Sequence, residues 1–116
     1  MKFQHAIELV ETAEAARMPR KKLASFLTPR EQAYCAWHKR RAAEHAAARL
    51  AAKRALRKLA PAAAWLEMEI HKEESGKPFF QFAGKTAALL RKRKIKTIHL
   101  SLSHTEEEAL ASVICL

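Results

Sequence analysis

The sequence predicts an α+β fold in which an antiparallel sheet packs on one long helix. Residues 49–58, late in an alanine-rich stretch, contain neither glycine nor proline, so nothing in them should interrupt a helix. Segments that alternate apolar and polar residues, which is typical of half-buried strands, lie mostly after residue 65. Helices gathered early and strands gathered late favour an α+β arrangement.

The size and composition are those of one globular domain. With 116 residues, we expect a single domain over residues 1–116. There is no run of eighteen apolar residues and no charged start followed by an apolar core, so we expect neither a membrane span nor a signal peptide. The two cysteines, Cys35 and Cys115, form no disulfide framework and are interpreted as buried free thiols. These features predict a cytoplasmic protein.

The chain is strongly basic. Its formal net charge is +10, from 22 lysine and arginine residues against 12 acidic residues. Such a balance predicts a polyanionic partner, which is a nucleic acid, a phosphate-rich cofactor, an acidic protein or an anionic membrane. Charge alone does not choose among these classes.

The first expected element is a mostly buried strand over residues 2–10, in which apolar side chains surround one carboxylate, Glu8. A carboxylate inside a sheet is costly unless it is paired or functional. The alternative is that Glu8 reaches solvent at the end of the strand. Both interpretations stay open at this point.

Helices are expected next. Residues 11–27 predict two short helical segments, with Pro19 and three basic residues between them. Thr28-Pro29-Arg30-Glu31 is a capping box, with a threonine N-cap, proline at the first helical position and glutamate three residues after the cap. The helix that it opens is expected to bend near residues 39–42, to resume, and to stop before Pro61.

Ten consecutive residues of this long helix hold five cations, which are Arg49, Lys53, Arg54, Arg57 and Lys58. At 3.6 residues per turn, Arg54 and Lys58 lie on one face, with the other three fanned beside them and the leucines turned inward. The five like charges repel one another. We therefore expect an anion from outside the chain to bind there.

Strands dominate the remainder. Residues 66–70 predict a strand, 73–78 a turn, and 79–82 the second arm of a hairpin. A short helix is expected over residues 83–92, and two further strands are expected over residues 95–103 and 109–116, joined by a turn at His104-Thr105.

Two short motifs are candidates for phosphate binding. In Gly76-Lys77-Pro78, the glycine lets the backbone approach a ligand, the lysine supplies a positive charge, and the proline restricts the backbone that leaves the turn. The alternative interpretation is a plain hairpin turn. Ser101-Leu102-Ser103-His104-Thr105 places three hydroxyls and an imidazole at the end of a strand, and its alternative is a polar loop. There is no metal-ligand cluster of useful spacing and no glycine-rich phosphate loop.

Four segments occur in the order and spacing of one family, which are residues 6–10, 49–53, 76–78 and 101–105. With Phe26-Leu27-Thr28 and Glu31 before the long helix, they make nearly the whole chain resemble the short holo-acyl-carrier-protein synthases. Members of that family are 4′-phosphopantetheinyl transferases.

The resemblance implies transfer of 4′-phosphopantetheine from coenzyme A to a serine of an acidic acyl carrier protein, in fatty-acid or polyketide biosynthesis. Adenosine 3′,5′-bisphosphate is the other product. The resemblance also implies a homotrimer, with coenzyme A in a cleft between subunits and Mg²⁺ on the pyrophosphate. An acidic carrier protein matches the +10 charge of this chain.

The same resemblance implies the site residues. The catalytic residues are expected to be Glu8, Arg54 and Lys58, and Glu8 is also the expected metal ligand. The residues expected to bind coenzyme A are Arg49, Lys53, Lys58, Gly76, Lys77, Pro78, Ser103, His104 and Thr105.

The chain departs from the family pattern at the metal site, which is an aspartate in the first strand and a glutamate directly after the helix lysine. Glu8 is a longer carboxylate at the first position, but Arg54 at the second has no acceptor for a cation. In addition, a family arginine that meets the carrier protein aligns with Glu14, and Arg17 lies one turn on.

We hypothesise that Arg54 replaces the glutamate together with its metal, because each contributes one positive charge and a guanidinium holds two phosphate oxygens. Glu8 then takes the serine proton, directly or through water. The alternative is a homologue without catalysis that binds coenzyme A or a carrier protein, or completes another transferase's site within a hetero-oligomer of related subunits. A nucleic-acid-binding protein is the least favoured interpretation, because no sequence-reading module is present.

Overall fold

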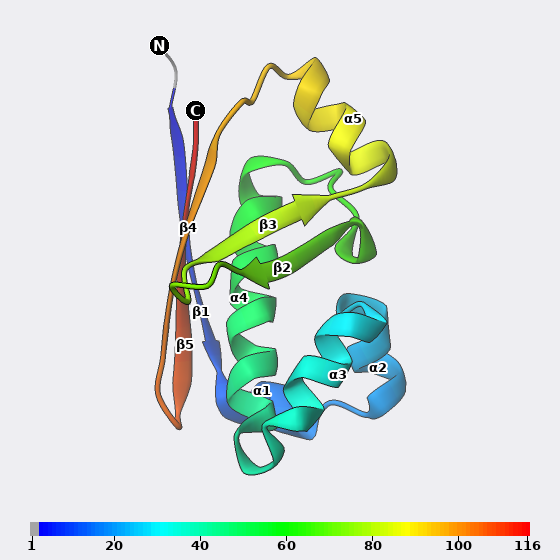
Figure 1. Cartoon of the computed structure of the whole chain (residues 1–116), viewed down its shortest axis with the longest axis vertical. Coiled ribbons are helices and arrows are strands. Elements are labelled where there is room, and N and C mark those ends of the chain that lie inside the picture. The colour runs from blue at the N-terminus through cyan, green and yellow to red at the C-terminus, as the bar shows by residue number, and fades with distance from the viewer. Residues whose placement is uncertain (1–2) are drawn as a thin grey trace.

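The computed structural model describes residues 3–116, so residue 2 of the expected first strand lies outside them. Strand β1 (Gln4–Glu11) precedes the helices α1 (Thr12–Arg17), α2 (Arg20–Phe26), α3 (Pro29–Trp37) and α4 (Ala42–Leu59), with the 3₁₀ turn η1 (Lys39–Arg41) between the last two. The 3₁₀ turn η2 (Trp65–Glu67), β2 (Met68–Lys72), β3 (Pro78–Phe82), α5 (Gly84–Lys92), β4 (Ile98–His104) and β5 (Glu108–Cys115) follow (Figure 1). This is the predicted order of strands and helices.

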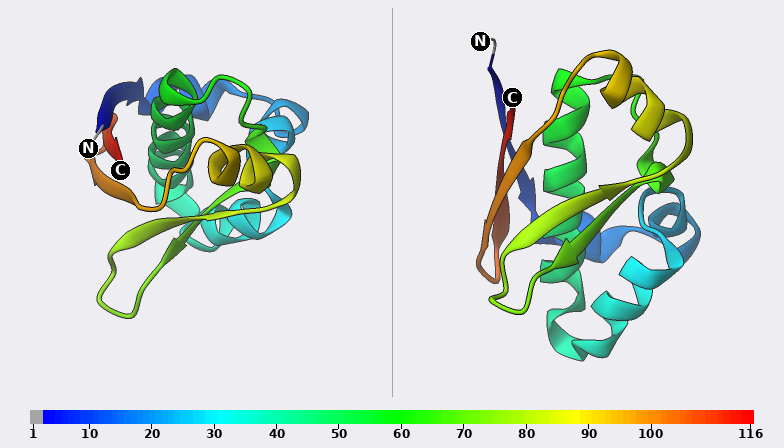
Figure 2. Two further views of the ribbon diagram at one scale, coloured as in Figure 1. Left: turned by 90° about the horizontal axis from the view of Figure 1, so that it is seen from above. Right: turned by 45° about the horizontal axis from the view of Figure 1, so that its top comes forward.

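The strands form two antiparallel sheets instead of the single sheet that was expected. The first has the order β1-β5-β4, with Ala111 of β5 opposite both Glu8 and Leu102. The second is the hairpin β2-β3, with Ile70 opposite Phe80. Helix α4 packs against β1 and β5, and the hairpin crosses another side of the helix (Figures 1 and 2). The α+β class and the sheet packed on a long helix are confirmed.

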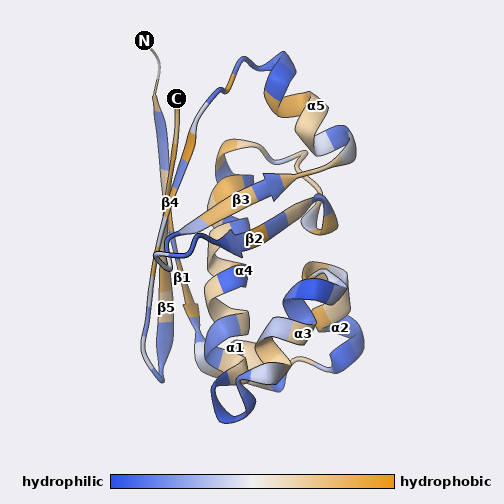
Figure 3. Ribbon diagram, viewed as in Figure 1, coloured by the Kyte–Doolittle hydropathy of each residue, from blue (hydrophilic) through white to orange (hydrophobic). Residues whose placement is uncertain are grey.

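Helix α4 forms the centre of the core because its small side chains let the neighbouring elements approach closely. Its buried apolar residues are Ala46, Ala47, Ala48, Leu50, Ala51, Ala52, Ala55 and Leu56. Figure 3 shows apolar colouring along much of α4 and hydrophilic colouring at η1, which leads into it. The predicted bend is confirmed at η1, where Lys39 has a φ of 49°. No helix within residues 3–116 has both the length and the apolarity needed to cross a membrane.

Strand β1 is half exposed, which corrects the expectation of a mostly buried strand. Ala6 and Val10 are buried, whereas Ile7 and Leu9 are each 51% exposed. Alternate side chains of a strand point to opposite faces, so Glu8 lies on the inner face with Ala6 and Val10. There its carboxylate is paired with an α4 lysine, so Glu8 is a paired carboxylate of the inner face and not a solvated strand end.

The capping box forms as predicted and extends into the core. Thr28 Oγ1 accepts a hydrogen bond from the Glu31 amide at 3.2 Å, and Glu31 Oε1 accepts one from the Thr28 amide at 3.0 Å. The same Oε1 accepts from Lys53 Nζ at 2.6 Å, and Oε2 accepts from the Ile70 amide at 2.8 Å. One buried carboxylate therefore joins α3, α4 and β2.

Lys53 completes this buried ion pair. Its side chain is 0% exposed, and Nζ also donates to the carbonyls of Phe26 at 2.7 Å and Trp65 at 3.0 Å. The three protons of the ammonium are thus donated inside the core. Burial lowers the pKa of Lys53, and the charge of Glu31 opposes that effect. The pair holds the end of α2 and the start of η2 against α4.

The variant Lys53→Met tests the pair, because it leaves Glu31 buried without its cation. We expect the free energy of unfolding to fall by about 3–5 kcal/mol, which is the usual cost of breaking a buried pair. Urea denaturation followed by circular dichroism measures it. The control Lys92→Met, at an exposed position of α5, should change stability by less than about 0.5 kcal/mol.

The double variant Glu31→Gln/Lys53→Met should regain part of the lost stability, because no unpaired charge remains in the core. A Lys53→Met protein as stable as the wild type would contradict the structural role of the pair.

Candidate functional site

Each of the five cations of α4 makes contacts within the chain, and three of them, Lys53, Arg54 and Lys58, pair with carboxylates. The binding of an external anion at this helix stays a prediction. Because residues of an α-helix are about 100° apart, the cations point in different directions. Arg54 and Lys58 meet carboxylates of α1 and β1, Arg49 lies against α3, and Arg57 donates to backbone carbonyls of the segment after the helix. The helix therefore has two separate charged sides.

On one side, four residues form what we call the carboxylate–cation cluster, Glu8, Glu14, Arg54 and Lys58. Lys58 Nζ lies 2.9 Å from Glu8 Oε2 and donates to the Ile7 carbonyl at 2.8 Å. Arg54 donates to Glu14 from both terminal nitrogens, from Nη1 to Oε1 at 3.1 Å and from Nη2 to Oε2 at 2.5 Å. The structure thus places the three predicted catalytic residues in two neighbouring ion pairs, because Arg54 and Lys58 lie one helical turn apart and the charge of Glu8 acts on Arg54. Glu14 is the fourth member.

Both members of the Glu14–Arg54 pair are ionised at neutral pH. The hydrogen bonds from Arg54 hold the pKa of Glu14 below its usual range; burial opposes them, and the positive charges of Arg54, Lys22 and Arg17 act in the same direction as the bonds. The bonds to Glu14 raise the pKa of Arg54. The contact is therefore a charge-assisted pair with two parallel hydrogen bonds, which is the strongest kind that these groups form.

The donor set of the cluster does not fit the Mg²⁺ ion that the resemblance implies. Mg²⁺ requires oxygen ligands in near-octahedral geometry. Glu8 already binds an ammonium, and the second expected ligand position holds Arg54, which has only donors. Across residues 3–116, no group of three or more histidine, cysteine, aspartate or glutamate side chains is arranged to hold a metal ion. The cluster is an arrangement of ion pairs and not a metal centre.

Lys53 and Arg49 lie away from the cluster. The expectation that Lys53 contacts coenzyme A does not fit its position, because its ammonium is buried and fully hydrogen-bonded in the core. Arg49 is 3% exposed, its guanidinium lies 4.2 Å from the centre of the Tyr34 ring, and Nη1 donates to the His45 carbonyl at 3.2 Å. Its Nε has no hydrogen-bond partner in the described part of the chain.

Three imidazole rings gather beside the first half of α4. The ring of His45 lies between those of His38 and His104, with centroid distances of 3.9 and 5.2 Å. His104 Nδ1 is 3.2 Å from Glu44 Oε1. Burial first, and then the positive charge of neighbouring groups, lower the pKa of His45 to about 4. Its ring is therefore neutral at pH 7.

The predicted residues His104 and Thr105 line a polar cavity of about 630 Å³ at the start of α4. The other lining residues are Thr12, Arg40, Arg41, Ala43, Glu44 and Glu106. Arg40 and Arg41, which lie in η1, were not predicted from the sequence as site residues. Consecutive cations at a break between two helices were the available signal. Guanidinium, imidazole and hydroxyl groups around one cavity suit an anionic ligand.

Gly76 and Lys77 lie in the turn of the β2-β3 hairpin, and Pro78 is the first residue of β3, opposite Lys72. Gly76 has a φ of 91°, in the region that favours glycine, and its amide donates to the Glu73 carbonyl at 2.8 Å. Figure 2 shows that the turn extends away from the body of the molecule. In the described residues, no hydrogen bond or ion pair joins this turn to the carboxylate–cation cluster.

The Ser103-His104-Thr105 motif does not form one group of donors. Ser103 is exposed on the outer face of β4, whereas His104 lies on the inner face, because neighbours on a strand point in opposite directions. Thr105 Oγ1 accepts hydrogen bonds from the amides of Glu107 and Glu108 and so closes the β4–β5 turn. Only His104 and Thr105 reach the polar cavity.

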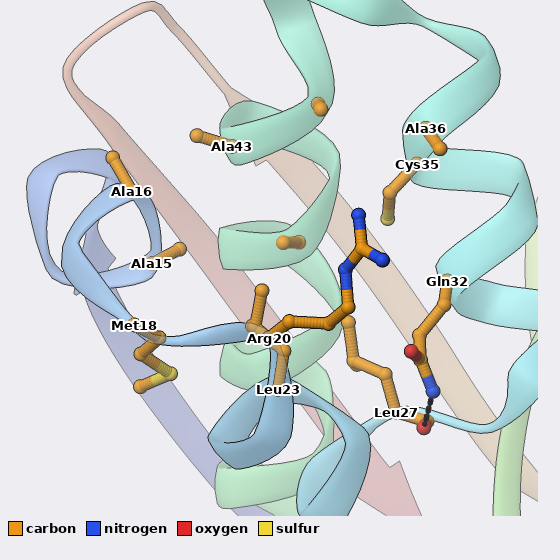
Figure 4. A pocket seen from close by; sticks show the side chains of 12 residues that line it. Ala15, Ala16, Met18, Arg20, Leu23, Leu27, Gln32, Cys35, Ala36 and Ala43 are labelled. Carbon is orange, nitrogen blue, oxygen red and sulfur yellow. Dashed lines mark hydrogen bonds between the residues drawn. The ribbon is translucent and has the colours of Figure 1, made fainter.

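An apolar cavity of about 350 Å³ lies between the α1–α2 segment, α3 and α4 (Figure 4). Ala15, Met18 and Leu23 line it on one side and Cys35 on the other, and the Arg20 side chain extends into it. Burial raises the pKa of the Cys35 thiol, which makes Cys35 unsuited to act as a thiolate nucleophile.

An α+β domain with a cation-lined polar cavity and a surface cluster of lysine, arginine and carboxylates is typical of proteins that act on phosphate-bearing ligands. No family model matches the chain. A holo-[acyl-carrier-protein] synthase of Koribacter versatilis is 37% identical over 117 residues, which cover 93% of each chain.

Solved structures show the same fold. The holo-[acyl-carrier-protein] synthase of Neisseria meningitidis matches with a TM-score of 0.87 at 22% identity, covering 97% of this chain and 96% of that one. That of Bacillus anthracis, solved in complex with CoA (3′,5′-ADP), matches with a TM-score of 0.79 at 26% identity, covering 96% and 93%. The chain belongs to the holo-[acyl-carrier-protein] synthase family, as the four sequence segments predicted.

The low pKa of His45 predicts a pH dependence of stability. The folded state keeps this ring neutral down to about pH 4, whereas the unfolded state protonates it below about pH 6.5. The unfolded chain binds more protons in that window, so stability falls as the pH drops from about 6.5 to about 4, by up to ~3 kcal/mol. Urea denaturation at pH 7 and at pH 4.5 measures the loss.

The variant His45→Leu should lose less stability over this window than the wild type does. The groups that act on His45 are His38, His104, Arg49 and Lys72, and all remain in that variant. An identical loss in the two proteins would show that His45 does not carry the effect.

Proposed function

We propose that this chain transfers 4′-phosphopantetheine from coenzyme A to a serine of an acyl carrier protein. The serine oxygen forms a bond to the phosphorus that carries the pantetheine, the bond from that phosphorus to the bridging oxygen breaks, and adenosine 3′,5′-bisphosphate leaves. The observation that carries the proposal is the convergence of Glu8, Arg54 and Lys58 in one cluster of a chain that belongs to this family.

Phosphoryl transfer needs positioning and charge stabilisation more than covalent help. In the proposed mechanism Glu8 accepts the serine proton, directly or through water. Lys58 holds the Glu8 carboxylate through its ion pair and presents a second side of its ammonium to the pyrophosphate. Arg54 binds pyrophosphate oxygens and stabilises the charge that develops on them.

We propose that Arg54 supplies the charge that a metal-bound glutamate supplies in the family pattern. A glutamate with Mg²⁺ and an arginine each add one positive charge. Because the donors of the cluster do not fit a divalent ion, no step is assigned to one. Transfer should therefore continue without divalent cations.

The polar cavity is proposed to bind the nucleotide phosphates of coenzyme A. Arg40, Arg41 and His104 supply cationic and imidazole groups there, and Thr105 lies beside them. Arg49, with one unpartnered N–H among the described residues, is proposed to support this side. Gly76, Lys77, Pro78 and Ser103 are proposed to contact the nucleotide from a neighbouring part of the site. The coenzyme in the Bacillus anthracis relative supports a coenzyme A site in this family.

Two features support a homotrimer with a site shared between subunits. Within one chain, the carboxylate–cation cluster and the lining of the polar cavity have no residue in common, so a neighbouring subunit is proposed to bring the two groups together. The outer face of the β1-β5-β4 sheet also exposes large apolar side chains, which are Ile7, Leu9 and Leu110, and the exposed Phe3 directly precedes β1. Exposed apolar patches of this kind mark association surfaces.

Introducing charges on that apolar face tests the assembly. The double variant Ile7→Lys/Leu9→Lys should be monomeric, because like charges on an apolar interface cannot be buried without partners. Sedimentation equilibrium measures the mass of the assembly. The control Leu66→Lys changes a similarly exposed leucine (50%) of η2, away from the sheet, and should remain a trimer. Trimers of the double variant would contradict the proposed interface.

The acidic carrier protein is the proposed macromolecular partner, because complementary charge favours their encounter. No acidic residue lies between Glu74 and Glu106, whereas seven lysine and arginine residues do, one in the hairpin turn and the others in α5 and the segment that follows it. We further propose a cytoplasmic location, since both cysteines are free, as a reducing compartment favours.

The direct test is mass spectrometry of an apo carrier protein incubated with coenzyme A and this protein in excess chelator. We expect the carrier protein to gain the mass of one phosphopantetheine group. Lys58→Met should lower kcat/KM by about 10²–10³-fold, because one cation is removed from the developing charge. The control Lys21→Met, at an exposed position of α2 outside the cluster, should match the wild type.

Transfer that EDTA abolishes and Mg²⁺ restores would contradict the proposed role of Arg54. An unchanged mass of the carrier protein under all conditions would contradict the proposed transferase activity. Binding of coenzyme A without transfer would then favour the second candidate, a homologue that binds coenzyme A or completes a related subunit's site. The neutralised Glu14–Arg54 pair is the observation that favours it.

A further inference from the structure

The contact between Arg54 and Glu14 uses the terminal edge of the guanidinium. Nη1 and Nη2 each donate to a different oxygen of the Glu14 carboxylate. This is the same edge, and the same two-point geometry, by which an arginine grips two oxygens of a phosphate. A pyrophosphate and Glu14 therefore compete for one set of donors.

The pair is accessible to a ligand. The Arg54 side chain is 28% exposed and the Glu14 side chain 39% exposed. An ion pair at such a position is held weakly compared with a buried one, because water solvates both groups when they separate. The contrast within α4 is direct, since the neighbouring Lys53 is fully enclosed in its own ion pair.

The charges of the cluster cancel in the structure as it stands. Glu8 is paired with Lys58, and Glu14 is paired with Arg54, so the four side chains carry no net charge together. A neutral cluster attracts an anionic pyrophosphate far less than a cationic one does. Releasing Glu14 from the cluster would leave a net positive charge at the position where the anion is expected.

A released Glu14 has other cations within reach of its field. Arg17 of α1 and Lys22 of α2 both act on Glu14 in the direction that keeps it ionised. Their positive charges therefore continue to favour the ionised carboxylate when it leaves Arg54.

We infer that Glu14 is an internal competitor for Arg54 that the pyrophosphate of coenzyme A displaces, and that it sets the affinity of the site for the coenzyme. The inference rests on the proposed function, in which Arg54 binds the pyrophosphate. It assigns to Glu14 a role through Arg54 and no contact with the substrate. Glu14 lowers affinity for any ligand that does not bring enough negative charge to displace it.

The test is isothermal titration calorimetry with coenzyme A and with inorganic pyrophosphate. Glu14→Gln keeps the shape of the side chain and removes its charge, so it should bind both ligands about 3–10-fold more tightly than the wild type. Glu11→Gln is the matched control. It removes the same charge three residues earlier, from an exposed side chain that makes no hydrogen bond or ion pair within residues 3–116, and should change affinity by less than about twofold.

A thermodynamic cycle shows whether Glu14 acts through Arg54. In the Arg54→Gln background, Glu14→Gln should no longer tighten binding, because the guanidinium for which Glu14 and the pyrophosphate compete is absent. The melting temperature of each variant, followed by circular dichroism, confirms that it is folded. A second substitution, Glu14→Ala, guards against a new contact made by the glutamine amide and should also bind more tightly.

The inference is overturned if Glu14→Gln binds coenzyme A and pyrophosphate with unchanged or weaker affinity, since Glu14 would then only position Arg54. It is also overturned if the gain persists without Arg54, which would make it a general charge effect. The proposed function is judged separately, by transfer to the carrier protein. If the wild type transfers phosphopantetheine but Glu14→Gln does not bind more tightly, only the competition by Glu14 is refuted. If Glu14→Gln binds more tightly but the wild type transfers nothing, only the proposed transferase activity is refuted.

Discussion

The ion pair between Lys53 and Glu31 fixes the rotation of α4 about its own axis, and that rotation decides which neighbours the other α4 cations contact. Because successive residues of a helix lie about 100° apart, burying Lys53 toward α3 and β2 keeps Arg49 near the same side and turns Arg54 and Lys58 toward β1 and α1. A buried ion pair adds little stability over an apolar contact but makes other settings costly, since any rotation leaves a charge unpaired in the core. The orientation of the candidate site therefore depends on a contact that lies outside it.

Local signals in the sequence were strong enough to predict the order of elements, the capping box at residues 28–31 and the end of the long helix. The family resemblance also identified the three members of the cluster that lie on β1 and α4. Such signals could not predict the environment of each cation, because Lys53 and Arg54 are adjacent and alike in sequence. Tertiary contacts nevertheless bury the first fully and leave the second partly exposed. Pairing of Arg54 with Glu14, forty residues away, was equally hidden. The exposed face of β1 escaped prediction because its apolar residues occupy both sides of the strand.

The two departures from the family pattern at positions 14 and 54 belong together. The pattern has an arginine at the first and a glutamate at the second, whereas this chain has Glu14 and Arg54, and the structure pairs them directly. Complementary charge at these positions is kept, but its signs are exchanged. The exchange removes an oxygen ligand for a metal and places a covalently attached cation in the cluster. One coupled change thus accounts for both the altered metal position and the carboxylate that now holds Arg54.

A crystal structure of the chain with coenzyme A, grown with Mg²⁺ present, would show directly whether Arg54 takes the place of a metal ion at the pyrophosphate. We expect Arg54 to leave Glu14 and to bind oxygens of the pyrophosphate, with no ion between Glu8 and the coenzyme. An Mg²⁺ ion bridging Glu8 and the pyrophosphate, with Arg54 still bound to Glu14, would contradict this replacement.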